Sequence, residues 1–386
     1  MPIGKSALFD EMRNAFKNLD IRYRRNRKIE LAKLRIPRNP RTEKQQAVRQ
    51  AYGKCVEMWR SLSPEEKEEW NQKAEPYAIS GWNLFVKETL PSLLAPEVWY
   101  EVTITEQSGN NLTDYQILIS IDGDSEFFAS AENKREAIRV YDSDKTTKLP
   151  YWIEEWNPST YKAKIWTKVP SIPANGTKTI YLYIDPSLTA SEENPKDVFI
   201  FYDDLEAGID NFTHYRNGVI SWVDGELDMD ALSATNDNVA AINVGTFSLP
   251  LAVDFEEREI AYYDNEKNWM SIHICKSYPG DWTDNSGHTF LLRHNRNFQF
   301  FVDGSLKIGD TPSGVTPTEK LKVTMRAIDG RIWVDINGVN KVDWSGTIAN
   351  KSGYISFNNY GFHHRVDNVR IRKYIYPEPS ISYTKL

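Results

Sequence analysis

The spacing of apolar residues changes once along this 386-residue chain, and that change constrains the fold more than any other feature. Before about residue 95, apolar positions recur every three or four residues, which is typical of amphipathic helices. After Pro96 they alternate with polar positions, which is typical of half-buried strands. The chain is also too long for one ordinary core. We therefore expect a mainly β protein, with a small α-helical module followed by two antiparallel β-sandwich domains.

The first part of the helical module has a clear apolar face and one clear start signal. Residues 47–62 repeat Ala, Val, Tyr, Cys, Met, Trp and Leu at helical spacing. Thr42 with Gln45 has the form of a capping box that would begin this helix. Residues 6–35 are expected to form one or two further helices.

Two more short helices are expected before the period changes. Ser63 is a cap residue followed by Pro64 at the first helical position and by acids in the first turn. Pro76 is expected to end this helix. Ser80 opens the next one, and Pro91 is expected to close it.

Charge divides the chain at the same place. Residues 1–96 contain 19 Lys and Arg against 12 Asp and Glu, a net charge of +7. The remainder contains 28 against 42, a net charge of −14. A basic head on an acidic body predicts that the two ends meet different partners.

The basic residues gather between residues 22 and 44, where ten positive side chains meet only two negative ones. Such a run can neutralise phosphates or dock on an acidic protein surface. We favour docking, because the acidic remainder of the chain is suited to display. The predicted anchoring residues are Arg22, Arg24, Arg25, Arg27, Lys28, Arg35, Arg38 and Arg41.

Targeting and cysteine signals are sparse. Met1 to Lys17 lacks the apolar core of a secretory signal, and no run of 18 apolar residues could span a membrane. Cys55 and Cys275 fall in different predicted domains, so neither a disulfide nor a cysteine metal site is expected.

The pattern of turns and strands predicts two domains in the β region. Short strands separated by polar turns predict a sandwich up to about residue 190, and a polar, proline-bounded stretch follows. Asp303-Gly304 and Asn337-Gly338 are hairpin signals in the last part, for which a jelly roll is the natural architecture. The predicted domains are 1–95, 97–190 and 197–386.

Residues in the middle of the chain resemble a prokaryotic domain family of unknown function that commonly sits beside concanavalin-like domains. The resemblance covers about 90 residues between 97 and 190. It is carried by Asn111–Gln116, Leu149–Glu154, Lys164–Pro170 and Ile172–Gly176.

The last part is similar to the concanavalin A-like lectin and glucanase superfamily. The similarity rests on Phe201–Glu206, Trp222–Leu227 and Val366–Val369. The helical module is similar to short helical segments in structural proteins of tailed viruses and prophages, through Trp59–Lys67 and Ser80–Phe85 among others. This combination implies a virion or surface component, although fold-level analogy does not fix a function.

The superfamily includes glucanases that use two carboxylates on one strand, so hydrolysis is the alternative function. Glu226, Asp228 and Asp230 alternate and would face one side of a strand. The simpler interpretation is an edge strand with a solvated acidic face, and we apply the same interpretation to the acids of Phe255–Glu259. His363 and His364 would point to opposite faces.

The superfamily resemblance also implies one structural Ca²⁺ that ties the first and last strands together. Asp203, Asp204 and Asp367 are oxygen ligands in the matching places. The alternative is that Asp367 only caps a turn.

Carbohydrate binding would need exposed rings beside polar groups. The candidates are Tyr278, Trp282 and His288 on a long polar loop, with Trp269 nearby and Tyr360 as a neighbour. Alternatively, the loop aromatics fold back on the core.

The predicted function is a virion-associated structural or adhesion protein such as a capsid decoration or a head or tail fibre, without enzymatic activity. Its helices would attach to other proteins of the particle, and its β domains would be displayed on the particle surface and bind cell-surface glycans. A homo-oligomer or a larger assembly is expected. The alternatives are a glycoside hydrolase, or a DNA-binding protein, since Glu57–Lys67 and Trp82–Phe85 resemble parts of an HMG box in reversed order.

Overall fold

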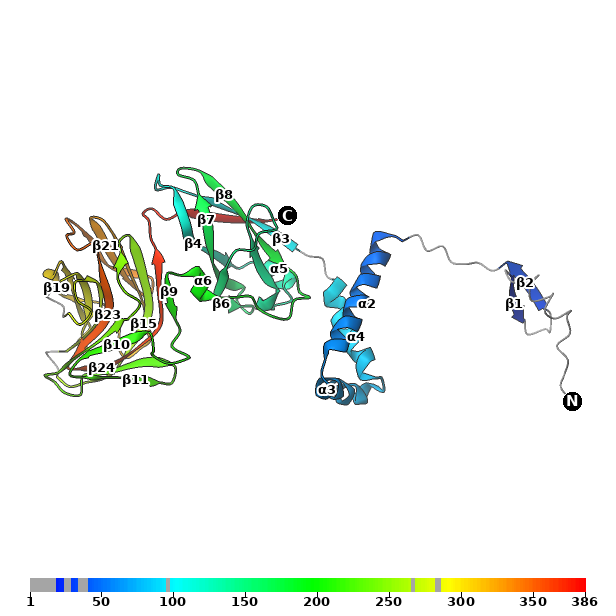
Figure 1. Cartoon of the computed structure of the whole chain (residues 1–386), viewed down its shortest axis with the longest axis horizontal. Helices are drawn as coiled ribbons and strands as arrows, with labels where there is room; N and C mark the ends of the chain where they lie inside the picture. Colours follow the sequence, from blue (N-terminus) through cyan, green and yellow to red (C-terminus); the bar gives the residue numbers. More distant parts are fainter. Residues whose placement is uncertain (1–18, 24–28, 34–40, 95–97, 265–267, 282–285) are drawn as a thin grey trace. The chain divides into compact units, whose positions relative to one another are not determined.

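The structure is a computed structural model that describes residues 19–23, 29–33, 41–94, 98–264, 268–281 and 286–386 (Figure 1). The chain divides into two compact units, Met1–Leu94 and Ala95–Leu386. The first is largely helical, and the second consists of antiparallel sheets. The predicted fold class is therefore confirmed. Within the described residues, no helix is long and apolar enough to cross a membrane.

The first unit contains a strand pair in a region where helices were expected. Strands β1 (Leu19–Tyr23) and β2 (Ile29–Lys33) form an antiparallel pair where helix was expected. Apolar residues alternate with polar ones at Leu19, Ile21 and Tyr23, which is the period of a strand. The rest of the predicted 6–35 helical region lies outside the described residues.

Three helices follow, with the predicted start signals in place. They are α2 (Glu43–Ser61), α3 (Pro64–Ala74) and α4 (Gly81–Leu94), with a short 3₁₀ turn η1 (Glu75–Tyr77) after α3. Thr42 Oγ1 accepts from the Gln45 N–H at 3.3 Å. Ser63 and Glu66 form a complete capping box.

Pro91 does not end its helix, because α4 continues to Leu94. A proline ring is compatible with helical φ and forfeits one backbone hydrogen bond, so the last turn can pass it. The helices meet on a cluster of rings in which Trp59 and Trp70 both contact Phe85, at centroid distances of 5.3 and 5.2 Å.

The first β domain of the second unit packs two sheets face to face around one apolar core. One sheet has the order β25 (Ser380–Lys385), β3 (Val98–Thr105), β8 (Thr177–Ile184) and β5 (Ile138–Tyr141). The other has the order β4 (Leu112–Asp122), β7 (Lys162–Ile172) and β6 (Tyr151–Asn157). Short helical turns are α5 (Ser125–Ser130), η2 (Arg135–Ala137) and α6 (Pro195–Val198).

The C-terminal sandwich packs two larger antiparallel sheets around a second core. We call one the β16 sheet: β10 (Phe212–Arg216), β13 (Asp237–Ile242), β23 (Ser352–Tyr360), β16 (Trp269–Lys276), β17 (His288–Leu292), β18 (Asn297–Val302) and β19 (Ser305–Pro312), with β14 (Phe247–Ser248) beside β23. The other is the β24 sheet: β11 (Val219–Val223), β12 (Glu226–Asp230), β24 (Phe362–Lys373), β15 (Leu251–Tyr262), β20 (Leu321–Ile328), β21 (Arg331–Ile336) and β22 (Val339–Ser345), with β9 (Phe201–Asp203) beside β24. The face of each sheet turned away from the core is its outer face.

The chain crosses between the two β domains twice. It leaves the first domain after β8, builds the C-terminal sandwich, and returns at its end so that β25 pairs with β3 along Ser380–Lys385 (Figure 1). The last strand therefore lies outside the sandwich, unlike the predicted range 197–386. Alternation alone marks a strand but does not indicate which sheet it joins.

Candidate functional site

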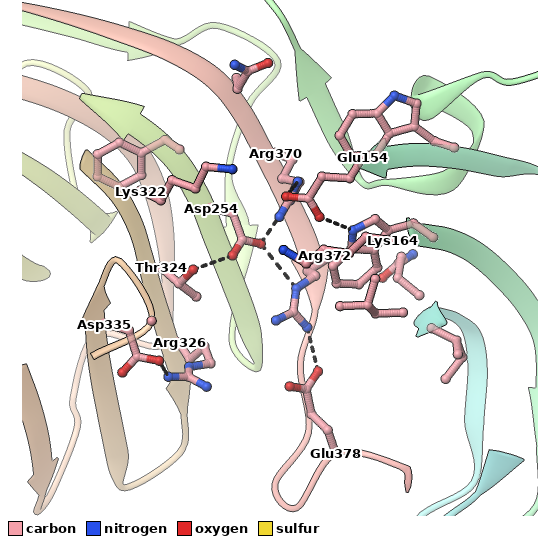
Figure 2. Close-up of a pocket in the computed structure, with 18 of the residues that line it drawn as sticks. Glu154, Lys164, Asp254, Lys322, Thr324, Arg326, Asp335, Arg370, Arg372 and Glu378 are labelled. Atoms are coloured by element: carbon pink, nitrogen blue, oxygen red, sulfur yellow. Dashed lines mark hydrogen bonds and ion pairs between the residues drawn. The ribbon is translucent and has the colours of Figure 1, made fainter. Parts of the chain in front are cut away.

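A cleft of about 450 Å³ lies between the two β domains (Figure 2). Asp254 of β15 occupies its buried side and accepts a hydrogen bond from Thr324 Oγ1 at 2.6 Å. Arg370 and Arg372 of β24 donate to the same carboxylate through their Nε atoms, at 3.3 and 3.2 Å. Burial raises the pKa of Asp254, but the two arginines outweigh burial and hold that pKa below its usual range.

The same arginines extend to the first β domain. Arg370 Nη1 lies 3.0 Å from Glu154 Oε1, and its guanidinium lies 5.2 Å from the ring centroid of Trp166. Arg372 donates to Glu378 at 2.6 Å, on the crossing segment that precedes β25. The charged groups at the centre of this cleft are thus already partners of one another, and they join the two domains.

The acidic strand β12 is neither an edge strand nor a solvated one. It lies between β11 and β24, and Glu226 and Asp228 are both buried on the outer face of the β24 sheet. Arg258 donates to Glu226 at 2.6 Å. Arg365 donates to Asp228 at 2.8 Å, and its Nη1 lies 3.5 Å from Glu226.

These contacts decide what the two carboxyl groups can do. Burial raises the pKa of Glu226, but Arg258 and Lys320 outweigh it, so the pKa lies below its usual value. Burial likewise raises the pKa of Asp228, and Arg365 and His363 outweigh it. A glycosidase acid must keep its proton near neutral pH, which requires a raised pKa. Both groups are therefore poorly suited to that role.

The acids of Phe255–Glu259 do not form one charged outer face. Glu257 is only 2% exposed, and its Oε2 has no hydrogen-bond partner among the described residues. Burial raises the pKa of Glu257 to about 8. His363 and His364 do point to opposite sides, because His363 contacts Asp228 at 2.9 Å while His364 is fully buried.

Two of the three predicted calcium ligands, Asp203 and Asp367, are engaged by other groups of the chain. Asp203 accepts from the Leu205 N–H and from the Asn211 amide, both at 2.9 Å. Asp367 is paired with the ammonium of Lys320 at 2.5 Å. In the part of the chain that the structure describes, no three His, Cys, Asp or Glu side chains are grouped to hold a metal.

The ammonium of Lys320 explains why. It also lies 3.1 Å from Glu256 and 3.4 Å from Glu226, so a cation of the chain itself already stands among three carboxylates. A lysine 47 positions before Asp367 in the sequence gives no local signal that it will fill this place.

Trp269 and Tyr360 form the aromatic centre of the β16 sheet's outer face. They are directly opposed across β16 and β23, and their rings stack at 4.7 Å with an angle of 14°. Both rings are half-buried. Trp269 Nε1 donates to Asn358 Oδ1 at 3.3 Å, and the Arg293 guanidinium lies 6.0 Å from the Trp269 ring centroid.

The next rows of β23 on this face carry the uncharged side chains of Asn358 and Ser356. Asn358 is opposed to Ser271 in the next row of the same face. The Asn358 Nδ2 and the Ser356 Oγ have no hydrogen-bond partner among the described residues, although both side chains are buried. The half-buried rings of Trp269 and Tyr360 are therefore the part of this row that a ligand can reach. A stacked ring pair is suited to the C–H face of a polyhydroxylated ligand.

A second ring pair lies on the same face. Tyr278 is 54% exposed and contacts Tyr215 of β10 edge to face at 5.7 Å. Arg216 donates to the Gly280 carbonyl at 2.9 Å and so holds this loop against β10. Tyr215 is two strands from Asn358 in the register, which is about 10 Å.

Two other residues were predicted to bind carbohydrate, and the structure describes only one of them, His288. Trp282 lies outside the described residues. His288 is fully buried, with its Nε2 2.8 Å from the Asn350 carbonyl, and so cannot meet a ligand at the surface. It is opposed to Ile274 and Val302, which both face the core, so strand alternation turns it inward. Tyr215 and Asn358 escaped prediction because their role depends on sheet register.

Most of the predicted basic anchor cannot be placed. Arg22 lies in β1, opposed to Glu30, and Arg41 is exposed before α2. Arg24, Arg25, Arg27, Lys28, Arg35 and Arg38 lie outside the described residues. Anchoring by this segment stays a prediction.

Comparison with known proteins finds one family match and one curated relative. Residues 134–223 match the family described as Domain of unknown function (DUF2341), which supports the expected presence of a domain of unknown function in this part of the chain. The match begins later than the resemblance at Asn111 and runs into β11. Over 291 residues, the chain is 24% identical to Uncharacterized protein 562 of Sulfolobus islandicus rod-shaped virus 1. That stretch is 68% of this chain, which spans about half the length of the viral protein.

Several solved structures share part of the architecture at low identity. A Bacillus subtilis protein of unknown function with a galectin-like fold is 11% identical, with 45% of this chain and 96% of that one covered and a TM-score of 0.38. The carbohydrate-binding module CBM66 from Bacillus subtilis is 11% identical, with 42% and 98% covered and a TM-score of 0.34. The exoplasmic/lumenal domain of VIP36 in its Ca²⁺- and Man-bound form is 9% identical, with 46% and 91% covered and a TM-score of 0.36.

Proposed function

We propose that this chain is a non-catalytic glycan-binding protein of a virus particle, and that the outer face of the β16 sheet is its binding surface. The observation that carries the proposal is the stacked, half-buried pair of Trp269 and Tyr360. The uncharged Asn358 is buried beside the pair, where its Oδ1 accepts a hydrogen bond from Trp269 Nε1 and so positions that ring. Aromatic faces cover the C–H side of a sugar ring.

Two further observations support the proposal. The carboxyl groups of Glu226 and Asp228, which would be needed for hydrolysis, are engaged by arginines and have lowered pKa values. The partial similarity to a viral protein supports a place in a virus particle. On this proposal the N-terminal unit attaches to other particle proteins and the β domains are displayed.

The binding surface can be tested with the full chain on a glycan array. Trp269→Ala should reduce retention on the bound glycans at least tenfold. Trp222→Ala is the matched control, because Trp222 is 48% exposed on the other sheet of the same sandwich. Equal binding by wild type and Trp269→Ala would contradict the assignment of this face.

The place of the chain can be tested separately with purified particles. Antibodies against the C-terminal sandwich should label intact particles, whereas antibodies against residues 41–94 should not. Absence of the chain from the particles would contradict the structural role.

A further inference from the structure

A second aromatic surface lies on the outer face of the four-stranded sheet in the first β domain. Trp99 of β3 is opposed to Tyr183 of β8, and their ring centroids are 4.7 Å apart. Tyr141 of β5 is opposed to Tyr181 of β8. The rings of Tyr141 and Tyr181 lie 5.5 and 6.1 Å from that of Trp99. The residues that alternate with these rings along the three strands, such as Tyr100, fill the core. The four rings therefore face outward.

The rings are half-buried and edged with polar atoms. The Tyr181 hydroxyl donates to Glu101 Oε2 at 3.5 Å, and the Tyr183 hydroxyl donates to Asp185 Oδ2 at 3.3 Å. The next row of the same face carries only hydroxyl side chains, because Thr103 is opposed to Thr179 on one side and Ser382 on the other.

One cation of the chain already rests on this surface. The ammonium of Lys145 lies 4.3 Å from the ring centroid of Tyr181 and 5.2 Å from that of Trp99. Lys145 is exposed and sits in a turn that Asp144 fixes by accepting from the Thr146 and Thr147 N–H groups. The ring faces are therefore accessible to a ligand that displaces this exposed side chain.

We propose that this surface, formed by Trp99, Tyr141, Tyr181 and Tyr183, is a second binding site, and that its ligand is a neutral saccharide. A sugar ring has an apolar C–H face for the rings and hydroxyls for the bordering carboxylates and hydroxyl groups. The carboxylates of Glu101 and Asp185 disfavour a polyanion, because like charges repel at this range. This site goes beyond the proposed function, since it lies in the other β domain.

The proposal makes the role of Lys145 specific. If the ligand is neutral, Lys145 competes with it for the ring faces, and Lys145→Ala leaves binding unchanged or tighter. If the ligand is a polyanion such as nucleic acid, Lys145 is an attractive charge, and the same substitution weakens binding. Because Lys145 is exposed, this variant does not disturb the core.

The experiment measures binding of the full chain in the Trp269→Ala background, which removes the site of the C-terminal sandwich. The probes are mannan, cellulose and chitin as neutral saccharides, with heparin and a single-stranded DNA 20-mer as polyanions. We expect one neutral saccharide to bind, a loss of at least tenfold on Trp99→Ala, and equal or tighter binding by Lys145→Ala. Tyr161→Ala is the control, because Tyr161 is 41% exposed in the same domain and away from this face.

Thermal unfolding of each variant separates binding from folding, and Tyr181→Phe adds a variant that keeps every ring. Removal of the Tyr181 hydroxyl should weaken saccharide binding about threefold and leave the midpoint of thermal unfolding unchanged. Binding of the neutral probes that is insensitive to Trp99→Ala, or no binding to any of them, overturns the proposal. Binding to heparin or DNA alone, weakened by Lys145→Ala, assigns the surface to a polyanion and also overturns it. Failure here leaves the Trp269 site untouched, because that site is tested by Trp269→Ala in the otherwise wild-type chain.

Discussion

The two outer faces of the C-terminal sandwich are built on the same alternation but differ in kind. On the β24 sheet, Glu226 and Asp228 alternate with core residues and are covered by Arg258 and Arg365. On the β16 sheet, Trp269 and Tyr360 face outward as a stacked ring pair, and the next row holds the uncharged Ser271 and Asn358. The first face pairs its acids with arginines of the same sheet, whereas the second centres on a stacked ring pair.

This difference shows that the neighbouring strands determine the chemical role of an outward-facing acid. Acids at alternate positions of a strand lie on the same face, because successive side chains point to opposite sides. Whether those acids are catalytic, solvated or paired depends on residues such as Arg365, which lies 137 positions from Asp228 in the sequence.

The largest effect is expected where the β24 sheet meets the first β domain. Arg372→Ala removes a buried guanidinium from Asp254 and Glu378 and leaves both carboxylates without it. We expect a loss of about 3–5 kcal/mol in the free energy of unfolding, measured by urea titration. Lys351→Ala is the control, since its pair with Asp329 is exposed and should matter little. Similar losses in both variants would show that the buried network is not special.

The next effect concerns Glu257, which points between the two sheets. Its folded pKa of about 8 is above the ordinary value of 4.5, so the folded state holds a proton that the unfolded state releases. Stability should therefore fall as pH rises from about 4.5 to 8, by up to about 1.4 kcal/mol per pH unit. Glu257→Gln should remove this slope and stabilise the protein at pH 8. An unchanged slope in the variant would mean that other groups cause it.

A smaller effect is expected on the ion-paired face itself. Arg365→Ala should cost about 1–3 kcal/mol, because two charged hydrogen-bond acceptors lose a donor. The lowered pKa values of Glu226 and Asp228 add stability at neutral pH that is lost as pH falls through their folded pKa values. The variant should therefore lose less stability than wild type between pH 6 and 3, as followed by urea midpoints. A larger acid-induced loss would contradict the assigned pairing.

The smallest effect is expected at the border of the open face. Tyr278→Ala removes an exposed ring whose described ring contact is with Tyr215. We expect stability to change by no more than about 0.5 kcal/mol and glycan affinity to fall about two- to fivefold. Titration calorimetry with the glycan that binds best on the array compares the affinity of the variant with that of wild type, and scanning calorimetry compares the stability. A loss as large as that of Trp269→Ala would move the centre of the site toward the loop.

Features with a local cause were predictable from the sequence. Asp303-Gly304 and Asn337-Gly338 form hairpin turns with positive φ at both residues, as these residue pairs favour. Ser63 begins α3 because its cap contacts lie within three residues. Trp269 and Tyr360 were expected only to lie near the loop of Tyr278, and their mutual stacking comes from the strand register.

Features that depend on pairing between distant strands were not predictable. Nothing in residues 380–385 indicates that they join β3, almost 280 positions earlier. Lys320 gives no local sign that it will stand beside Asp367 in place of a metal. The surface around Trp99 needs three strands in register, and only the folded chain brings Tyr141 and Tyr183 to it.

The most direct test compares the two faces in a single assay, with glycan retention and release of reducing sugar measured on the same oligosaccharides. The account predicts that the Glu226→Gln, Asp228→Asn double variant binds like wild type, that Trp269→Ala loses binding, and that no variant or wild type releases sugar. Turnover by wild type that disappears in the double variant would contradict the account and identify the β24 sheet as a catalytic face.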